Sequence, residues 1–467
     1  MHGTCGNFLS SAVVAYGNQS RMHKLEKIRK SLTTSQIIIL GFAGVILLGS
    51  LLLMLPVATR DGRGAVFADA LFTSTSAVCV TGLVVRDTAT YWSGFGQAVI
   101  LTLIQIGGMG VVTVAVAVFI VSGKRSSLRE RSIMQEAISA NQLGGIVRLT
   151  GFIIRMTVCF ELLGALVVAP AFCREFGVGK GIWYAVFHSV SAFCNAGFDL
   201  MGDKALYSSL TYFAYSPSVN IAVMSLIVIG GIGFLTWDDI RSKKFHFRKY
   251  RMQTKLILTV TLGLILLPAL FFFFMEFQEL PLGKRILCSL FQAVTPRTAG
   301  FNTVDFGLMS ENALAVMVIL MLVGGSPGST AGGIKTTTFA VTLSAAASVF
   351  RRREHVHFFN RRIDDATVRN ALAVLGMYLV LFLCGGFLIS QTEGLPLGTC
   401  LFESASAIAT VGLTLGITPG LGQLSRGILI VLMYIGRVGW LTLLFAAFSD
   451  KRQAGTERMP LEKLNVV

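Results

Sequence analysis

Long apolar stretches, separated by short charged segments, run through the whole chain. Six of them carry no charge over about 20 residues or more, the length of helix that a bilayer core requires. The pattern predicts six membrane-spanning helices. The six stretches lie between residues 30 and 60, 87 and 124, 204 and 238, 255 and 276, 311 and 335, and 369 and 393.

Two further stretches, residues 143–172 and 424–448, are apolar but interrupted by charges. With them the prediction rises to eight spans. A charged side chain inside a membrane-spanning helix needs a partner or a function. The charges are Arg148, Arg155 and Glu161 in the first stretch and Arg426 and Arg437 in the second.

Basic residues gather in every second connection between the predicted spans. Because cytoplasmic loops of membrane proteins are rich in Lys and Arg, these connections mark the cytoplasmic side. Both termini, residues 1–33 and 451–467, are therefore predicted to be cytoplasmic. The basic connections are residues 21–30, 124–131, 241–251, 351–362 and 451–452.

The composition supports a membrane protein and weakens two other classes. Hydrophobic residues make up 53% of the chain, charged residues 14%, and the mean hydropathy is +0.70. The excess of 40 Lys and Arg over 24 Asp and Glu could suit nucleic acid, but the basic clusters lack interleaved aromatic residues. The six histidines, including His188 and His246, show no pairing with carboxylates or cysteines. We expect no catalytic residues, no enzyme and no cofactor in this chain.

One sequence frame recurs in each pair of predicted spans. Three copies place a Phe ten residues and a Ser-Ala pair six and five residues before a glycine, and they run from Phe72 to Gly82, Phe187 to Gly197 and Phe402 to Gly412. A fourth copy, Phe291 to Gly300, is one residue shorter and lacks the Ser-Ala pair. We therefore predict four repeats. Repeats 1 to 4 comprise residues 34–125, 143–242, 253–350 and 366–450.

Each frame lies in an apolar stretch too short to cross the bilayer, so it must enter the membrane and return. Non-helical backbone at that depth has to be buried in protein or line a water-filled path. A short helix that points its negative C-terminus at the path favours a cation, and a glycine with positive φ lets carbonyls face a dehydrated ion. The predicted ion-binding filter comprises Val80, Thr81, Gly82, Leu83, Asn195, Ala196, Gly197, Phe198, Thr298, Ala299, Gly300, Phe301, Thr410, Val411, Gly412 and Leu413.

Four tight turns with purely structural glycines are the alternative to a filter. One glycine-containing loop would favour that alternative. Four copies at matching depth, three of them with the same frame, favour a filter for a monovalent cation.

A glycine-rich segment, residues 324–333, interrupts the second predicted helix of repeat 3. No helix continues unbroken through these glycines and Pro327. A hairpin between two full spans is the alternative, but each flank is short and an added crossing would move the basic residues 351–353 outside. We predict a helix broken at the bilayer midplane, of the kind found where transported ions pass. The likeness to a Walker nucleotide loop is rejected because Ile334 separates its glycine from its lysine.

These features resemble the superfamily of bacterial Trk and Ktr and plant HKT potassium transporters, over nearly the whole chain. The resemblance implies an all-α membrane protein with eight transmembrane helices, arranged as four helix–pore-loop–helix repeats around one pseudo-fourfold central pore, as in potassium channels. Eight spans look more like the Ktr membrane subunit than the longer TrkH type. The implied location is the plasma membrane of a bacterium.

The resemblance also implies the ion. The single filter glycine of each loop stands where potassium channels have the first glycine of their filter. Family members with serine in the first loop favour sodium, so Gly82 implies potassium. The implied potassium ligands are at Gly82, Gly197, Gly300 and Gly412.

In this family, a segment like residues 324–333 obstructs the path below the filter, and an arginine of the last helix lies near it. The alternative for Arg437 is a plain tether to backbone carbonyls. The implied gate residues are Gly324, Gly325, Ser326, Pro327, Gly328, Ser329, Thr330, Ala331, Gly332, Gly333, Lys335 and Arg437.

Other charged residues near the predicted filter have two readings. Acidic residues after three of the loops, Asp87, Asp199 and Asp305, could concentrate cations at the mouth or could cap local turns. Arg297 stands three residues before Gly300, where a charge aimed at the ion would be harmful, so we expect it behind the loop. For Arg155 and Glu161 we expect packing between repeats. 

The resemblance further implies a homodimer resting on a cytoplasmic nucleotide-binding ring of KtrA type, so that nucleotide acts only through the partner. The basic connections 126–142, 241–251 and 351–365 could meet the ring, although topology alone also explains them. Sodium dependence occurs in some relatives and stays open here. A secondary transporter with alternating access is the rival function, but four similar units favour a pore over two rocking halves.

Overall fold

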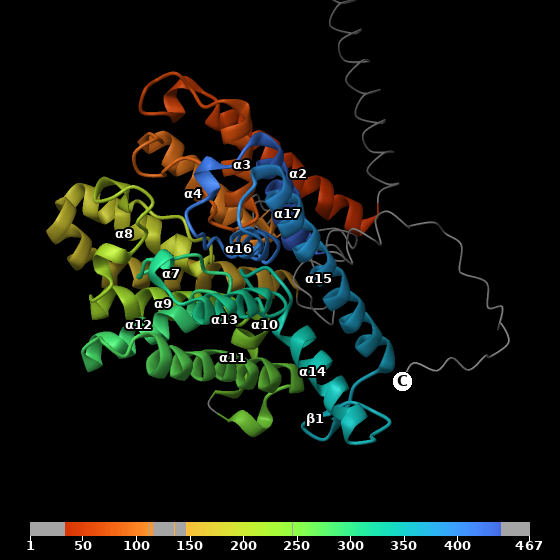
Figure 1. Ribbon diagram of the computed structural model, residues 1–467. Coiled ribbons are helices and arrows are strands. Elements are labelled where there is room, and N and C mark those ends of the chain that lie inside the picture. The colour runs from red at the N-terminus through yellow and green to blue at the C-terminus, as the bar shows by residue number, and fades with distance from the viewer. Residues whose placement is uncertain (1–32, 112, 115–134, 136–145, 245, 440–467) are drawn as a thin grey trace, which may run out of the picture.

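The computed structural model describes residues 33–111, 113–114, 135, 146–244 and 246–439 (Figure 1). The two predicted cytoplasmic terminal segments and the basic connection 124–131 lie outside the described residues, apart from Thr33. So does the end of the last predicted span, beyond Gly439. The described chain is mostly helical.

Each repeat begins with a long apolar helix. These are α2 (Thr34–Leu53), α7 (Ile146–Phe176), α11 (Met252–Phe271, extended by a π-helical turn, Phe272–Glu276) and α15 (Asp365–Glu393). All four are long and apolar enough to cross a membrane. The start of α2 is set by a capping box, in which the Thr33 hydroxyl accepts from the backbone N–H of Gln36 and the Gln36 side chain accepts from the N–H of Thr33.

A short helix follows in each repeat, and it ends at the filter frame. These are α3 (Phe67–Val78), α8 (Val178–Phe193), α12 (Leu282–Val294) and α16 (Leu397–Ile408). At 12 to 16 residues they extend about 18–24 Å, less than the roughly 30 Å of a bilayer core. The phenylalanine that opens each frame anchors its short helix, because Phe72, Phe187, Phe291 and Phe402 are all fully buried.

The remaining helices of each repeat are short or interrupted. They are α4 (Gly94–Met109), α9 (Pro217–Gly231) with α10 (Phe234–Lys243), α13 (Glu311–Leu322) with α14 (Thr336–Phe350), and α17 (Gln423–Val438). By length and composition the described helices provide four crossings, or five if α9 and α10 form one. Eight crossings therefore stay a prediction.

The sequence indicated one broken helix, in repeat 3. The structure also has a broken helix in repeat 2. The chain turns by 95° between α9 and α10, so the stretch 204–238 is not one straight span. Glycines with positive φ lie at the ends of α4, α9 and α17. Glycine is favoured at these positions because this backbone conformation strains any side chain. Their φ values are 86° at Gly110, 95° at Gly233 and 89° at Gly439.

Serine and glycine pairs hold the short helices against the long ones. In three repeats a serine of the short helix donates to a carbonyl of the long helix at 2.6–2.7 Å. A glycine of the long helix makes room, since a Cβ there would lie 2.5–2.6 Å from the serine Oγ. The serine, carbonyl and glycine sets are Ser74, Ile46 and Gly49; Ser189, Glu161 and Gly164; and Ser404, Phe382 and Gly385.

Helices of the four predicted repeats contact one another in chain order. Helix α4 of repeat 1 contacts α8 of repeat 2, α9 contacts α12 of repeat 3, α13 contacts α16 of repeat 4, and α17 returns to α3 of repeat 1. Figure 1 shows the same order, with the colours passing from red and orange at the top through yellow and green to blue on the right. The ends of the four short helices therefore meet near one centre.

One small sheet lies outside the helical body. Strands β1 (His357–Phe358) and β2 (Arg361–Arg362) form an antiparallel hairpin between α14 and α15. The hairpin carries part of the basic connection 351–362.

Candidate ion-binding filter and gate

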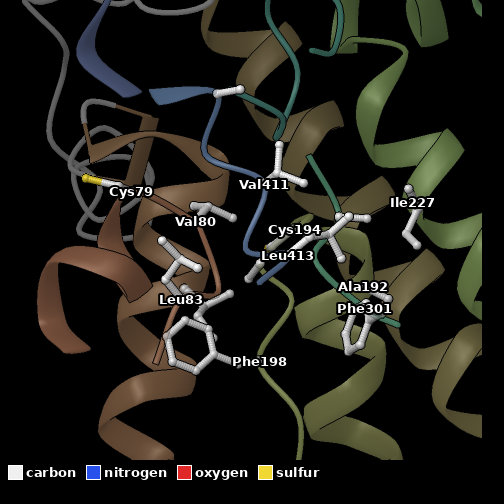
Figure 2. Packing of buried hydrophobic residues seen from close by; sticks show 14 of the residues in the cluster. Cys79, Val80, Leu83, Ala192, Cys194, Phe198, Ile227, Phe301, Val411 and Leu413 are labelled. Atoms are coloured by element: carbon white, nitrogen blue, oxygen red, sulfur yellow. The ribbon is translucent and has the colours of Figure 1, made fainter. Parts of the chain in front are cut away.

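The four predicted filter loops meet at one place. Each follows directly on the C-terminus of a short helix, and all sixteen predicted filter residues are buried. Figure 2 shows side chains from different loops, among them Val80, Leu83, Phe198, Phe301 and Leu413, close together in one view. The structure thus brings together residues that lie more than 300 positions apart in the chain.

The four glycines form a closed ring in chain order. A Cβ on Gly82 would lie 2.5 Å from the carbonyl oxygen of Ala196, and one on Gly197 would lie 2.8 Å from the Cα of Gly300. In the same way a Cβ on Gly300 would strike the carbonyl oxygen of Val411. One on Gly412 would strike that of Thr81. Each glycine therefore faces the backbone of the next loop, and the fourth faces the first.

The backbone of each loop alternates in handedness. Two residues before each glycine stands a residue with left-handed φ, with values of 59° at Val80, 60° at Asn195, 63° at Thr298 and 52° at Thr410. The glycines themselves have φ between 68° and 98°. Such alternation turns successive carbonyls to the same side, as an ion-coordinating loop requires. A left-handed side-chain residue costs about 1–2 kcal/mol, so other contacts must hold these loops in place.

Hydroxyl groups of the short helices hold the loops. In repeats 1 and 4 the glycine N–H donates to a serine Oγ, from Gly82 to Ser76 at 3.1 Å and from Gly412 to Ser406 at 3.0 Å. In repeat 2 the Ser191 hydroxyl donates instead to the carbonyl of Phe198, at 2.7 Å. The Ser-Ala pair of the frame is thus the support of the filter backbone.

Repeat 3 solves the same problem with a different residue. Its frame lacks the Ser-Ala pair and is one residue shorter, but the hydroxyl of Thr295 donates to the carbonyl of Phe301, as Ser191 does to Phe198. By sequence alone, this copy has lost the Ser-Ala pair. The function of the serine is kept, since a threonine hydroxyl can make the same hydrogen bond.

The acidic residues after the loops act as caps. Asp87 accepts from the N–H groups of Ala89 and Thr90, and also from that of Tyr207 in repeat 2. Asp305 accepts from Gly307 and caps a short 3-10 helix. For these two residues the capping alternative is therefore what the structure shows.

Asp199 combines a cap with an unusual titration. Its carboxylate accepts from the N–H of Met201 at 2.9 Å. Burial raises the pKa of the Asp199 carboxyl to about 7; the Met201 hydrogen bond lowers it, and the negative charge of Asp87 adds to the rise. Two residues beyond Gly197, this carboxyl therefore changes charge near neutral pH.

Two basic residues near the filter point away from it. Arg297 is buried, and its guanidinium donates to the hydroxyl of Thr261 on α11 at 3.3 Å, which confirms the prediction that it lies behind the loop. Arg86 pairs with Asp69 of α3 at 2.8 Å. Asp69 also pairs with Arg426 of α17 at 2.8 Å, and this bond joins repeat 1 to repeat 4.

Two charged residues of the long helix α7, Arg155 and Glu161, have different surroundings. Arg155 is exposed and donates to the carbonyl of Gly151 on its own helix. Glu161 is buried, and its carboxylate contacts Gln105 of repeat 1 and the thiol of Cys194 at the end of α8. The Glu161 contacts agree with packing between repeats, whereas the hydrogen bond of Arg155 to the described residues stays within its own helix.

The segment 324–333 lies against the filter loops. It is held at its base, where the N–H of Gly324 donates to the carbonyl of Ile334 at 2.9 Å. A Cβ on Gly332 would strike the hydroxyl of Thr410, a predicted filter residue. The chain is not helical between the end of α13 at Leu322 and the start of α14 at Thr336, and the loop there touches the fourth predicted filter loop directly.

Arg437 reaches across the centre to two repeats. Its guanidinium donates to the carbonyl of Thr330 in the loop and to the carbonyls of Gly107 and Gly108 at the end of α4. Lys335 donates to the carbonyl of Ala331 at 2.8 Å. Within the described part of the chain, no carboxylate lies within ion-pairing distance of either side chain. Arg437 therefore binds backbone carbonyls, and one of these carbonyls belongs to the loop 324–333.

Sequence reasoning missed a second set of glycines. They lie one turn before the break in α4, α9 and α17, where a Cβ would strike the carbonyl oxygen at the end of a short helix. The signal was present as a recurring Gly-x-x-Gly spacing that ends each of these helices. The glycines and their facing carbonyls are Gly107 with Val78, Gly230 with Phe193 and Gly436 with Ile408.

Comparisons with known proteins agree on one family. Residues 6–454 match the family model TrkH, described as cation transport protein. The chain is 39% identical to the potassium/sodium uptake protein NtpJ of Enterococcus hirae over 439 residues, which cover 92% of this chain and 96% of that protein. It is also 39% identical to the Ktr system potassium uptake protein B of Bacillus subtilis over 420 residues, covering 89% and 93%.

A solved structure supports the fold. The crystal structure of the potassium transporter TrkH from Vibrio parahaemolyticus matches with a TM-score of 0.71 at 20% identity, covering 88% of this chain and 84% of that one. Family and fold are those of transporters and not of enzymes. The chain therefore belongs to the TrkH family of cation transport proteins.

Proposed function

We propose that this chain takes up potassium through a bacterial plasma membrane as the ion-translocating subunit of a Ktr-type system, the role of KtrB. The observation that carries the proposal is the closed ring of Gly82, Gly197, Gly300 and Gly412, in which each glycine faces the next loop. Cation uptake by the family and the names of the relatives point to the same function.

The proposed architecture is a pore with pseudo-fourfold symmetry. Eight membrane-spanning helices form four repeats, and the four short helices point their C-termini at the ring. Partial negative charge at a helix C-terminus favours a cation over an anion. The circular packing of α4 on α8, α9 on α12, α13 on α16 and α17 on α3 supports this arrangement.

The proposed filter uses backbone carbonyls of the four loops as potassium ligands. The alternating handedness of residues 80–82 and of the three equivalent segments supports this role. Carbonyls replace the hydration shell of the ion, and the glycines permit the approach of neighbouring backbones. No cofactor in the chain takes part.

The proposed gate is the loop 324–333 together with Lys335 and Arg437. The loop packs against Thr410 at Gly332, and the Arg437 guanidinium donates to the loop carbonyl of Thr330. A fixed positive charge beside the path opposes a cation until the loop moves. Conduction then depends on how firmly the loop is held.

The proposed assembly is a homodimer on a cytoplasmic nucleotide-binding ring of KtrA type, with both termini in the cytoplasm. The relative from Bacillus subtilis is named as part of a Ktr system, which supports a partner-dependent function. The relative from Enterococcus hirae is named for potassium and sodium, so sodium dependence belongs to the proposal as its second candidate.

Uptake of potassium and of sodium in a host without its own potassium transport tests the proposal. The unaltered protein should restore growth on low potassium and should take up potassium in preference to sodium. Gly82→Ser places a side chain against the carbonyl of Ala196 and should reduce the preference. Equal uptake of both ions by the unaltered protein contradicts the potassium assignment.

A further inference from the structure

The loop 324–333 is held by the corner between α9 and α10, a part of repeat 2. We define this corner as residues 230–234. Its bend of 95° is made at Gly233, whose φ is +95°. The helix break leaves carbonyls of α9 and the first N–H of α10 without partners inside a helix.

Those free groups are used by the loop. Three backbone hydrogen bonds and one from a side chain connect the corner and the end of α8 to the loop. They run from Ser326 N to Gly231 O at 2.9 Å, from Thr330 N to Gly230 O at 3.3 Å, from Phe234 N to Gly328 O at 2.7 Å, and from Thr330 Oγ1 to Phe193 O at 3.1 Å.

Thr330 lies at the centre of this contact. Its N–H and its hydroxyl donate to repeat 2, while its carbonyl accepts from Arg437 of repeat 4. The loop of repeat 3 is thus held by hydrogen bonds to both repeat 2 and repeat 4. On the repeat 2 side the chain continues beyond the bend as the helix α10.

That helix, α10, is rigidly tied to the corner. The Trp237 indole N–H donates across the bend to the carbonyl of Ile229 at 2.9 Å, and the ring packs on Phe193 and Phe160. The other end of α10 is exposed at Arg241 and Lys243. A displacement of α10 therefore reaches the hydrogen bonds of the loop through Trp237 and Phe234.

We propose that the α9–α10 corner holds the loop 324–333 in its obstructing position, with Thr330 and Gly233 as positioning residues. The inference rests on the proposed gate function of the loop. Among the described residues, the equivalent glycine of repeat 1, Gly110, has a φ of +86°, and only the Thr113 hydroxyl lies within 4 Å of a Cβ built there.

The two glycines provide a matched pair of variants. Gly233→Ala and Gly110→Ala impose the same backbone strain, because both φ values are positive and nearly equal. A Cβ on Gly233 would lie 2.7 Å from the carbonyl oxygen of Pro327 in the loop. On Gly110 the nearest atom is the Thr113 hydroxyl at 3.8 Å. Only Gly233→Ala should displace the loop.

Threonine 330 provides a second pair. Thr330→Val keeps the shape but removes the hydroxyl, and Thr330→Ser keeps the hydroxyl. A net hydrogen bond is equivalent to about a fivefold change in an equilibrium constant. Thr330→Val should therefore raise the fraction of open protein about fivefold, and Thr330→Ser should stay near the unaltered protein.

The experiment measures potassium flux of the full chain in proteoliposomes without the cytoplasmic partner, together with the ratio of potassium to sodium flux. We expect Gly233→Ala and Thr330→Val to raise potassium flux about fivefold at an unchanged ion ratio, and Gly110→Ala and Thr330→Ser to leave it unchanged. A change in the ion ratio would mean a disturbed filter and would count against the inference.

A variant with the loop 324–333 shortened separates this inference from the proposed function. If shortening raises flux while Gly233→Ala matches Gly110→Ala and Thr330→Val matches Thr330→Ser, the loop is a gate but the corner does not hold it. If shortening leaves flux unchanged, the proposed gate is wrong and the inference falls with it.

Discussion

At the scale of single residues, the glycines of this protein have two distinct uses. Some are needed for positive φ, and others because a neighbouring backbone leaves no room for a Cβ. Gly82 and Gly412 require both, with φ of 98° and 92° and a carbonyl of the next loop in contact. Gly416, with φ of 89°, has nothing within 4 Å of a Cβ and requires only the first.

This difference yields a test of the filter. Gly412→Ala should reduce potassium flux at least tenfold, because the added methyl strikes the carbonyl of Thr81. The figure corresponds to about 1.4 kcal/mol, a modest estimate for a side chain forced into close-packed backbone. The measurement is isotope uptake in proteoliposomes. Gly416→Ala is the control, since it has the same φ strain without the clash, and equal losses in both variants would contradict the steric argument.

The raised pKa of Asp199 predicts that potassium uptake depends on pH. With its pKa raised to about 7, the carboxyl is neutral below that pH and negative above it. A negative charge at the mouth attracts potassium, so the apparent affinity should be about fivefold higher at pH 8 than at pH 6, the equivalent of about 1 kcal/mol at short range. The check is potassium uptake as a function of concentration at the two pH values.

Asp199→Asn is the matching variant. It keeps an acceptor for the Met201 N–H and removes the titration, so its affinity should be low and independent of pH. An undiminished pH dependence in this variant would assign the effect to another group.

At the scale of elements, the interrupted helices are more informative than the long ones. Helices α4, α9 and α17 all end in a Gly-x-x-Gly sequence whose first glycine packs on the end of a short helix. In repeat 4 the second position of this sequence is Arg437, where repeats 1 and 2 have Gly108 and Gly231. Of these three helix ends, only that of α17 carries a charge at this position.

Arg437 gives the element-scale prediction. Arg437→Ala removes both the positive charge beside the path and the hydrogen bond to Thr330. Potassium flux should rise about fivefold in protein without its cytoplasmic partner, because at least one hydrogen bond of about 1 kcal/mol to the loop is lost. Flux is measured in that background and in a variant with the loop 324–333 shortened. Unchanged flux in both backgrounds would leave Arg437 as a structural tether only.

At the scale of the whole molecule, the circle of repeats is closed by a charged contact. Asp69 of α3 pairs with Arg426 of α17 and with Arg86, and its side chain is only 6% exposed. Asp69→Asn leaves the partly buried Arg426 with a weaker acceptor and should lower stability by about 2 kcal/mol. The measurement is unfolding of the detergent-solubilised protein.

The control for this prediction is the pair Arg362–Asp365, in which both side chains are more than half exposed. Exposed pairs contribute about 0–1 kcal/mol, so Asp365→Asn should change stability little. Similar losses of stability from Asp69→Asn and Asp365→Asn would mean that the contact between α3 and α17 contributes no more than an exposed ion pair.

The helical membrane class and the four glycine loops could be predicted from the chain because they depend on local properties. Apolar length sets membrane insertion, and the frame from Phe72 to Gly82 repeats because each loop faces the same packing problem. The break at residues 324–333 was predictable for the same reason, since glycine and proline end helices by their own backbone chemistry.

The tertiary structure decided what depends on contacts between repeats. Asp87 caps a turn and also accepts from Tyr207, and Arg437 extends to Gly107, and neither partner is near in sequence. Sequence spacing cannot assign such partners because a hydrogen bond requires a distance and a direction in space. The order of the glycines around the ring was likewise decided only when the four repeats packed against one another.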